Sequence, residues 1–103
     1  MALDEIHKGD IGTVFRRTLK DGAAIVDVSG ATTKEFLFRK PSRATFARAA
    51  VFLTDGTDGV LDYSTISGDL DEAGDWYLQV HIVLPGGEWH SDQQRFKVFP
   101  NII

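Results

Sequence analysis

The sequence predicts an all-β domain of the immunoglobulin-like sandwich type, with about seven antiparallel strands. Short runs of alternating apolar and polar residues cover most of the chain. Turn signals rich in Gly, Asp and Pro separate these runs at intervals of roughly 8–12 residues. No segment has a strong amphipathic helical pattern, and no internal repeat is visible. An open Greek-key barrel would produce a similar pattern and remains the alternative architecture.

Length and composition predict one domain over residues 1–103. The chain has 103 residues, 43% of them hydrophobic and 25% charged, which is typical of soluble globular proteins. No window approaches the length of a membrane-spanning helix, and residues 1–8 lack the apolar region of a secretory signal. The absence of cysteine excludes disulfides and thiolate zinc sites. No cofactor and no membrane contact are expected.

The first half of the chain contains four expected extended segments, which cover residues 11–20, 24–28, 34–40 and 45–54. Arg17 falls on the apolar side of the first segment, which predicts a bulge or a strand end there. Asp21-Gly22 is a strong turn signal between the first two segments. Residues 42–50 resemble a helix locally, but their flanks favour an extended structure.

The second half contains the clearest strand, at residues 75–84. Two Asp-Gly steps before it predict a hairpin turn into a strand at residues 60–65, and residues 67–74 form a polar crossover. After the clearest strand, residues 85–87 form a tight turn and residues 88–99 return as its partner. Alternation along these segments predicts the core, which comprises Phe15, Phe36, Phe38, Phe52, Trp76, Leu78, Val80, Ile82, Phe96 and Val98.

The net charge of −4 is unevenly distributed. Lys and Arg cluster between Lys8 and Arg48, whereas the segment between Arg48 and Arg95 is acidic and contains neither. Such a pattern is typical of solvated faces, and it also allows a two-signed surface that pairs neighbouring copies. Nucleic acid is a poor partner, because the net sign is wrong and few aromatic residues interrupt the basic stretch.

Residues 70–80 resemble the corner between the fifth and sixth strands of immunoglobulin-like domains. A Leu, an acidic residue and Ala-Gly precede an aromatic residue that opens a long alternating strand. Gly74 would let the backbone turn into that strand. The resemblance implies that Trp76 is the corner aromatic and that Leu78 lies where antibody domains carry a cysteine.

The whole chain resembles the N-terminal immunoglobulin-like domain of phage baseplate upper proteins and related small phage tail proteins. The matching stretches are residues 6–13, 26–32 and 36–41, the Asp-Gly hairpin, the Leu-Asp-x-Ala-Gly corner, and the last hairpin with Phe96-Lys97-Val98. The resemblance implies a non-enzymatic structural component of a tailed-phage virion, an adaptor or decoration protein of the tail or baseplate. It implies other virion proteins and copies of this chain as partners, and location in the virion after assembly in the host cytoplasm.

Catalytic and metal-binding chemistry finds little support in the sequence. His81 and His90 are expected to be cross-strand neighbours, and with His7 they are the only histidines. Residues 55–62 contain oxygen ligands that suit calcium but lack the required loop spacing, so turns are the favoured interpretation. Four carboxylates, Asp69, Asp71, Glu72 and Asp75, lie on the crossover, where we expect no apolar wall to raise a pKa. No metal site and no enzyme is predicted.

The candidate partner-binding residues are three aromatic and three basic side chains. They are Tyr77, Trp89 and Phe99, which are expected to point outward, and Arg39, Lys40 and Arg43, which are expected to face acidic neighbours. For Trp89, folding back over its own hairpin is the favoured alternative. A carbohydrate-binding adhesion module with a glycan as partner is the second functional hypothesis, and it requires Trp89 and Tyr77 to be coplanar on one concave face.

Overall fold

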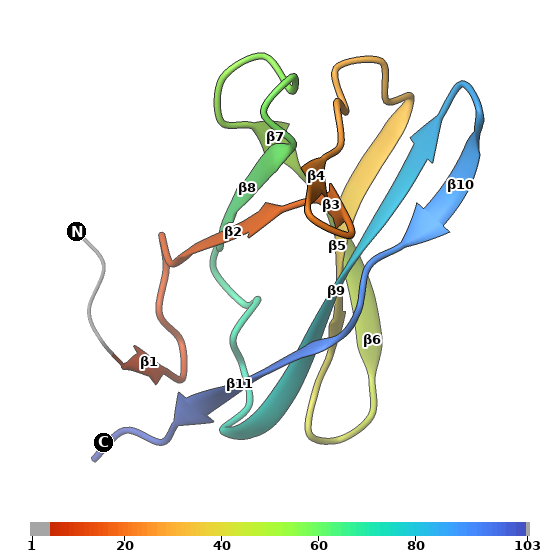
Figure 1. Cartoon of the computed structure of the whole chain (residues 1–103). Helices are drawn as coiled ribbons and strands as arrows, with labels where there is room; N and C mark the ends of the chain where they lie inside the picture. Colours follow the sequence, from red (N-terminus) through yellow and green to blue (C-terminus); the bar gives the residue numbers. More distant parts are fainter. Residues whose placement is uncertain (1–4, 103) are drawn as a thin grey trace.

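The computed structural model describes residues 5–102 and shows two β-sheets packed against each other (Figure 1). The described residues contain no helix, and therefore none that could cross a bilayer. The chain is an all-β sandwich, as the alternating pattern predicts.

The larger sheet has the strand order β1-β11-β9-β5-β6, with β10 extending one end of β9. Its strands are β1 (Ile6–His7), β5 (Thr33–Arg39), β6 (Thr45–Ala49), β9 (Gly74–Leu84), β10 (Gly87–His90) and β11 (Gln94–Phe99). The smaller sheet has the order β2-β8-β7, with β2 (Val14–Thr18), β7 (Val51–Phe52) and β8 (Val60–Ser64). A separate hairpin joins β3 (Lys20–Asp21) to β4 (Ala24–Ile25).

This strand order is that of an immunoglobulin-like sandwich. The central strand β9 lies between β5 and β11, and β8 lies between β2 and β7 in the opposing sheet. The chain crosses from the larger to the smaller sheet at Ala50, a buried residue between β6 and β7. One pairing differs from the antiparallel expectation, because β1 runs parallel to β11.

The core lies between the sheets and follows the predicted alternation. Eight of the ten predicted core residues are buried, and Phe52 and Phe96 are partly buried against them. Phe38 contacts the rings of Phe15 and Phe46 at centroid distances of 5.5 and 5.0 Å, so aromatic side chains fill the centre of the sandwich. The sequence analysis missed four buried apolar residues, which are Val28, Ala50, Leu61 and Leu70.

The predicted turns and strand ends are largely confirmed. Within residues 42–50, residues 45–49 are extended in β6 and the rest form the turn before it and the step after it, so the segment is not helical. The turn into β9 contains Gly74, whose φ of +131° is in the region that L side chains rarely adopt. A Cβ at Gly74 would also lie 2.9 Å from Cγ of Pro41. Gly74 therefore has the role expected of it at this corner.

We expect Leu61→Ala to lower the free energy of unfolding by about 2–5 kcal/mol, because Leu61 is fully buried and truncation leaves a cavity. Leu53→Ala removes the same atoms from a side chain that is 44% exposed and should cost less than about 1 kcal/mol. Chemical denaturation of both variants measures the difference. Equal losses would contradict the assignment of Leu61 to the core.

Candidate functional site

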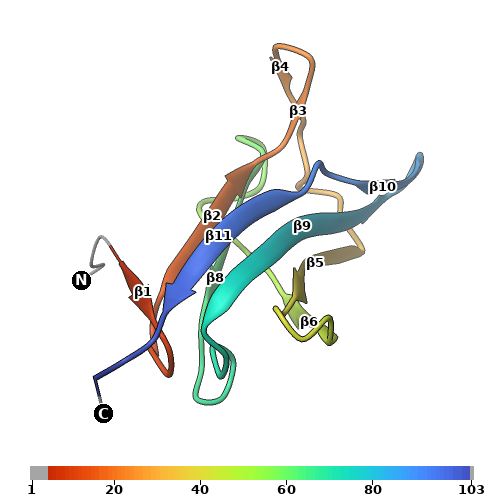
Figure 2. The same ribbon diagram turned by 90° about the horizontal axis from the view of Figure 1, so that it is seen from below.

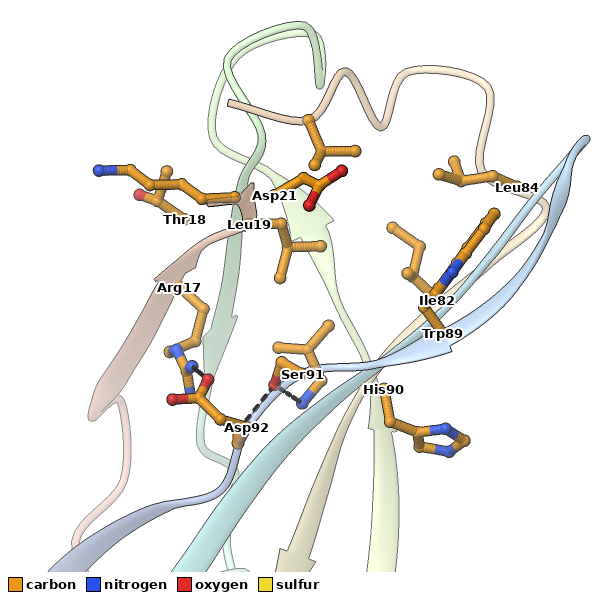
Figure 3. Close-up of a pocket in the computed structure, with 13 residues that line it drawn as sticks. Arg17, Thr18, Leu19, Asp21, Ile82, Leu84, Trp89, His90, Ser91 and Asp92 are labelled. Carbon is orange, nitrogen blue, oxygen red and sulfur yellow. Dashed lines mark hydrogen bonds and ion pairs between the residues drawn. The ribbon is translucent and has the colours of Figure 1, made fainter. Parts of the chain in front are cut away.

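A cleft of about 520 Å³ opens between the two sheets at one end of the sandwich (Figure 3). Thr18 and Leu19, at the end of β2, form one wall with the β3 strand, and the β9–β10 hairpin forms the other. Ile82 and Leu84 of β9 lie along the apolar floor. The β3–β4 hairpin and the β9–β10 hairpin, which both contribute residues to the cleft, project in different directions (Figure 2).

Trp89 extends into this cleft from β10. It pairs in register with Ile82, whose side chain faces the core, so the indole lies on the inner face of the hairpin. The indole covers Gly87, where a Cβ would lie 3.0 Å from Cη2, and the residue is still 51% exposed. Trp89 therefore folds over its own hairpin, as the alternative interpretation predicted, and does not point outward.

Tyr77 occupies the opposite face of the same sheet. It alternates with the buried residues Trp76 and Leu78, which places its ring on the outer face of β9. The guanidinium of Arg39, its cross-strand neighbour, lies 4.5 Å from the ring centroid. Because Tyr77 and Trp89 lie on opposite faces, they do not form the coplanar aromatic platform that the glycan hypothesis requires.

The other predicted binding residues are dispersed. Lys40 forms an ion pair with Asp71 at 2.9 Å, and Arg43 lies in the β5–β6 turn with a φ of +75°. Phe99, at the far end of β11, is partly buried against the ring of His7 at 5.9 Å. The structure thus brings Arg39 and Tyr77 together, places Lys40 and Arg43 in the turn that follows Arg39, and leaves Trp89 and Phe99 elsewhere.

Arg17 lies on the inner face of β2 without a bulge, because β2 and β8 pair in continuous register through Thr18. The predicted bulge at Arg17 is therefore absent, and the predicted strand end is one residue too early, because β2 ends at Thr18. Its Nη2 donates a hydrogen bond of 3.0 Å to Asp92 across the lower end of the cleft. Its Nη1 is buried and has no hydrogen-bond partner among residues 5–102.

Asp69 is a buried carboxylate of the crossover, yet its pKa is not raised, in agreement with the expectation from the sequence. It is only 2% exposed, and it accepts hydrogen bonds from the Tyr63 hydroxyl, the Ile66 amide and the Arg48 guanidinium. Burial alone would raise the pKa of Asp69, but these hydrogen bonds outweigh it and hold the pKa below its ordinary value. Burial and the contact with Asp69 raise the pKa of Tyr63 to about 12.

His81 and His90 are cross-strand neighbours as predicted, with stacked rings 4.6 Å apart. His81 Nδ1 is 2.8 Å from Glu35 of β5, and its Nε2 is 3.5 Å from Glu88 of β10. The hydrogen bond with Glu35 raises the pKa of His81, and Glu88 adds to the effect, while burial opposes both. The histidine therefore links three strands of the larger sheet.

The calcium-friendly loop is organised by its own turns. Asp55 accepts hydrogen bonds from Thr57, Asp58 accepts one from the Val60 amide, and Asp62 pairs with Arg16 instead. No group of three or more potential metal ligands occurs within the described part of the chain.

The sequence analysis missed an apolar surface on the smaller sheet. It consists of exposed apolar side chains on β2 and β7, which are Val14 and Val51, and in the loops next to β2, β7 and β8, which are Ile11, Leu53 and Ile66. The alternation of strand residues could have predicted this surface. Val14 and Val51 are each next in sequence to a residue that points inward, the buried Phe15 and the partly buried Phe52, so they point outward. We call these five residues the small-sheet surface.

The geometry defines this chain as an all-β sandwich with a cleft at one end and exposed apolar side chains on and beside its smaller sheet. No protein-family model matches the sequence, and no curated protein sequence is significantly similar to it.

We expect Asp69→Asn to lower the free energy of unfolding by roughly 3 kcal/mol at neutral pH, because it weakens a buried, charge-assisted hydrogen-bond network. Because the pKa of Asp69 is lowered in the folded state, its contribution is present above about pH 4 and is lost as the pH falls further. Denaturation curves between neutral and acid pH measure this. Asp71→Asn, at an exposed ion pair, is the control and should change little.

We also expect a pH dependence on the alkaline side that belongs to His81. Its raised pKa means that the stabilisation is complete below about pH 6.5 and is lost as the pH rises through the folded-state pKa. The wild type should therefore lose more unfolding free energy than His81→Gln between about pH 6 and pH 8.5. His7→Gln is the control, and an identical loss in all three proteins would contradict the assignment.

Proposed function

We propose that this chain is a non-enzymatic structural component of a tailed-phage virion, an adaptor or decoration protein of the tail or baseplate. It acts by docking, as a preformed sandwich, onto other virion proteins and onto copies of itself. The sequence resemblance supports the virion setting, and the exposed small-sheet surface supports the docking mechanism.

The small-sheet surface is the observation that carries the docking proposal. Val14 and Val51 lie on the same outer face as the ion pair between Arg16 and Asp62, so this face combines exposed apolar side chains with one bidentate polar contact. Large exposed apolar patches on soluble domains mark contacts with other molecules, and the five exposed side chains of this surface would be covered by such a contact. Burial of this face removes apolar surface from water, which favours association.

Charge makes a smaller contribution to docking. Four Lys or Arg side chains form ion pairs with Asp in the described part of the chain, which are Arg16–Asp62, Arg17–Asp92, Lys40–Asp71 and Arg48–Asp69. Each joins the basic first half of the sequence to its acidic second half. Four of the nine Lys and Arg residues from Lys8 to Arg48 are thus paired within one chain, and Arg39 and Arg43 are among those that remain for contacts with acidic neighbours.

The test is the solution mass by light scattering over a concentration series at low and high salt. We expect multimers that persist at high salt, because apolar contacts are not screened. Val51→Lys should weaken association by about tenfold or more, since it buries an unpaired charge in the contact.

Ile25→Lys is the matched control, because Ile25 is 57% exposed and Val51 is 60% exposed, but Ile25 lies in the β3–β4 hairpin. It should associate like the wild type. A strict monomer under every condition would contradict docking between copies, and equal effects of the two substitutions would contradict the small-sheet surface.

A further inference from the structure

The outer edge of β2 is an unpaired row of backbone hydrogen-bonding groups. The Thr65 amide donates to the Thr13 carbonyl and the Leu19 amide donates to the Gly59 carbonyl, so the odd-numbered residues of this strand pair with β8. Backbone groups alternate along an antiparallel strand, which directs those of Val14, Arg16 and Thr18 away from β8. No other strand within residues 5–102 pairs with that edge.

This edge borders the apolar cleft. The floor of the cleft contains Ile82 and Leu84, Leu19 and Val26 line its sides, and the half-exposed indole of Trp89 overhangs it. Side chains that point inward from a strand added beside β2 would enter this space, because alternate residues of a strand point to the same face. The edges of β6, β7 and β10 also lack a second partner strand in the described chain. The edge of β2 differs from them because it carries Arg17, whose unpartnered Nη1 lies at the cleft.

Arg17 supplies a hydrogen-bond donor at the same site that lacks an acceptor. Its Nη1 is a buried donor without a partner, and an unsatisfied charged donor is costly. Its only carboxylate, Asp92, has a side chain that is 90% exposed, so the ion pair is weak and an incoming acceptor can compete with it. Lys20 and Asp21 also line the cleft, so its charges are balanced, and the unpartnered Nη1 of Arg17 favours an occupant that brings one acceptor oxygen.

We propose that an extended segment of a different polypeptide adds to the β2 edge as a strand, inserts alternate apolar side chains beneath Trp89 and gives an acceptor oxygen from one acidic side chain to Arg17. A segment that matches the five residues of β2 spans about 17 Å. The proposal rests on the proposed docking function and names the contact made with another virion protein.

A second copy of this chain is a poor occupant of the same edge. Antiparallel pairing of β2 with β2 about a two-fold axis at Arg16 would place the two Arg16 side chains opposite each other, and like charges directly opposite are destabilising. A glycan is also a poor occupant, because it does not provide alternating amide donors and carbonyl acceptors at strand spacing. The regular backbone edge thus selects a polypeptide.

The probe is a capped synthetic peptide, Thr-Val-Thr-Glu-Thr-Val-Thr-Val-Thr, titrated into the intact chain labelled with ¹⁵N. The Glu and the Val residues share one face of the extended peptide, as the cleft requires. We expect saturable binding, with amide hydrogen exchange slowed at Val14, Arg16 and Thr18. A peptide with Lys in place of Glu should bind about fivefold more weakly or worse.

Two variants test the edge itself. Thr18→Pro removes an outward N–H while sparing the pairing with β8, and proline is tolerated on such an edge. It should weaken peptide binding by about tenfold, whereas Thr18→Ala, the matched control, should bind within about twofold of wild type. Thermal unfolding of both variants checks that they fold, and Arg17→Gln should weaken binding in the folded state if Thr18→Pro proves unstable.

The proposal is overturned if the peptide does not bind at about 1 mM, if protection appears on β6 or β10 instead, or if Thr18→Ala weakens binding as much as Thr18→Pro. Multimers in light scattering whose β2 amides exchange rapidly would leave the docking function in place and overturn this site. Multimers with protected β2 amides and no added peptide would identify a second copy as the occupant, which also overturns the proposal.

Discussion

The buried carboxylate of Asp69 is the interaction on which the arrangement of this sandwich depends. It bonds to Arg48 of β6 in the larger sheet and to Tyr63 of β8 in the smaller sheet, and it accepts the Ile66 amide from its own crossover. A buried charge is tolerated only when such partners surround it, so both sheets and the crossover must be in place together. This one carboxylate therefore sets how the two sheets are positioned at the end of the sandwich near the crossover.

The crossover is held at further points along the same loop. Lys40 bonds to Asp71, Ser42 bonds to Glu72, and the Trp76 indole donates to the Glu72 carbonyl. These contacts fix the start of β9, which is the central strand of the larger sheet. β9 also carries core side chains and the floor of the cleft. The contacts that position the start of β9 therefore also help to position the cleft at the opposite end of the molecule.

The two ends of the sandwich consequently differ in character. Polar contacts close the end near the crossover, whereas the end near the β9–β10 hairpin remains open as the cleft. The unpaired edge of β2 runs from one end toward the other, which places free backbone groups beside apolar side chains. Unpaired edges of this kind are a hazard for uncontrolled association unless a specific partner covers them, and the proposed docking function would supply such a partner.

The sequence by itself determined the all-β class, the turns and most of the core, because strand alternation is a local property of period two. It identified the inward row of β9 and the pairing of His81 with His90 for the same reason. Only the tertiary structure decided that Asp69 is buried, that Trp89 faces inward, and that Val14 and Val51 gather on one exposed face. Those outcomes depend on which strands become neighbours and where the sheets separate, and both are set by contacts between residues far apart in the chain.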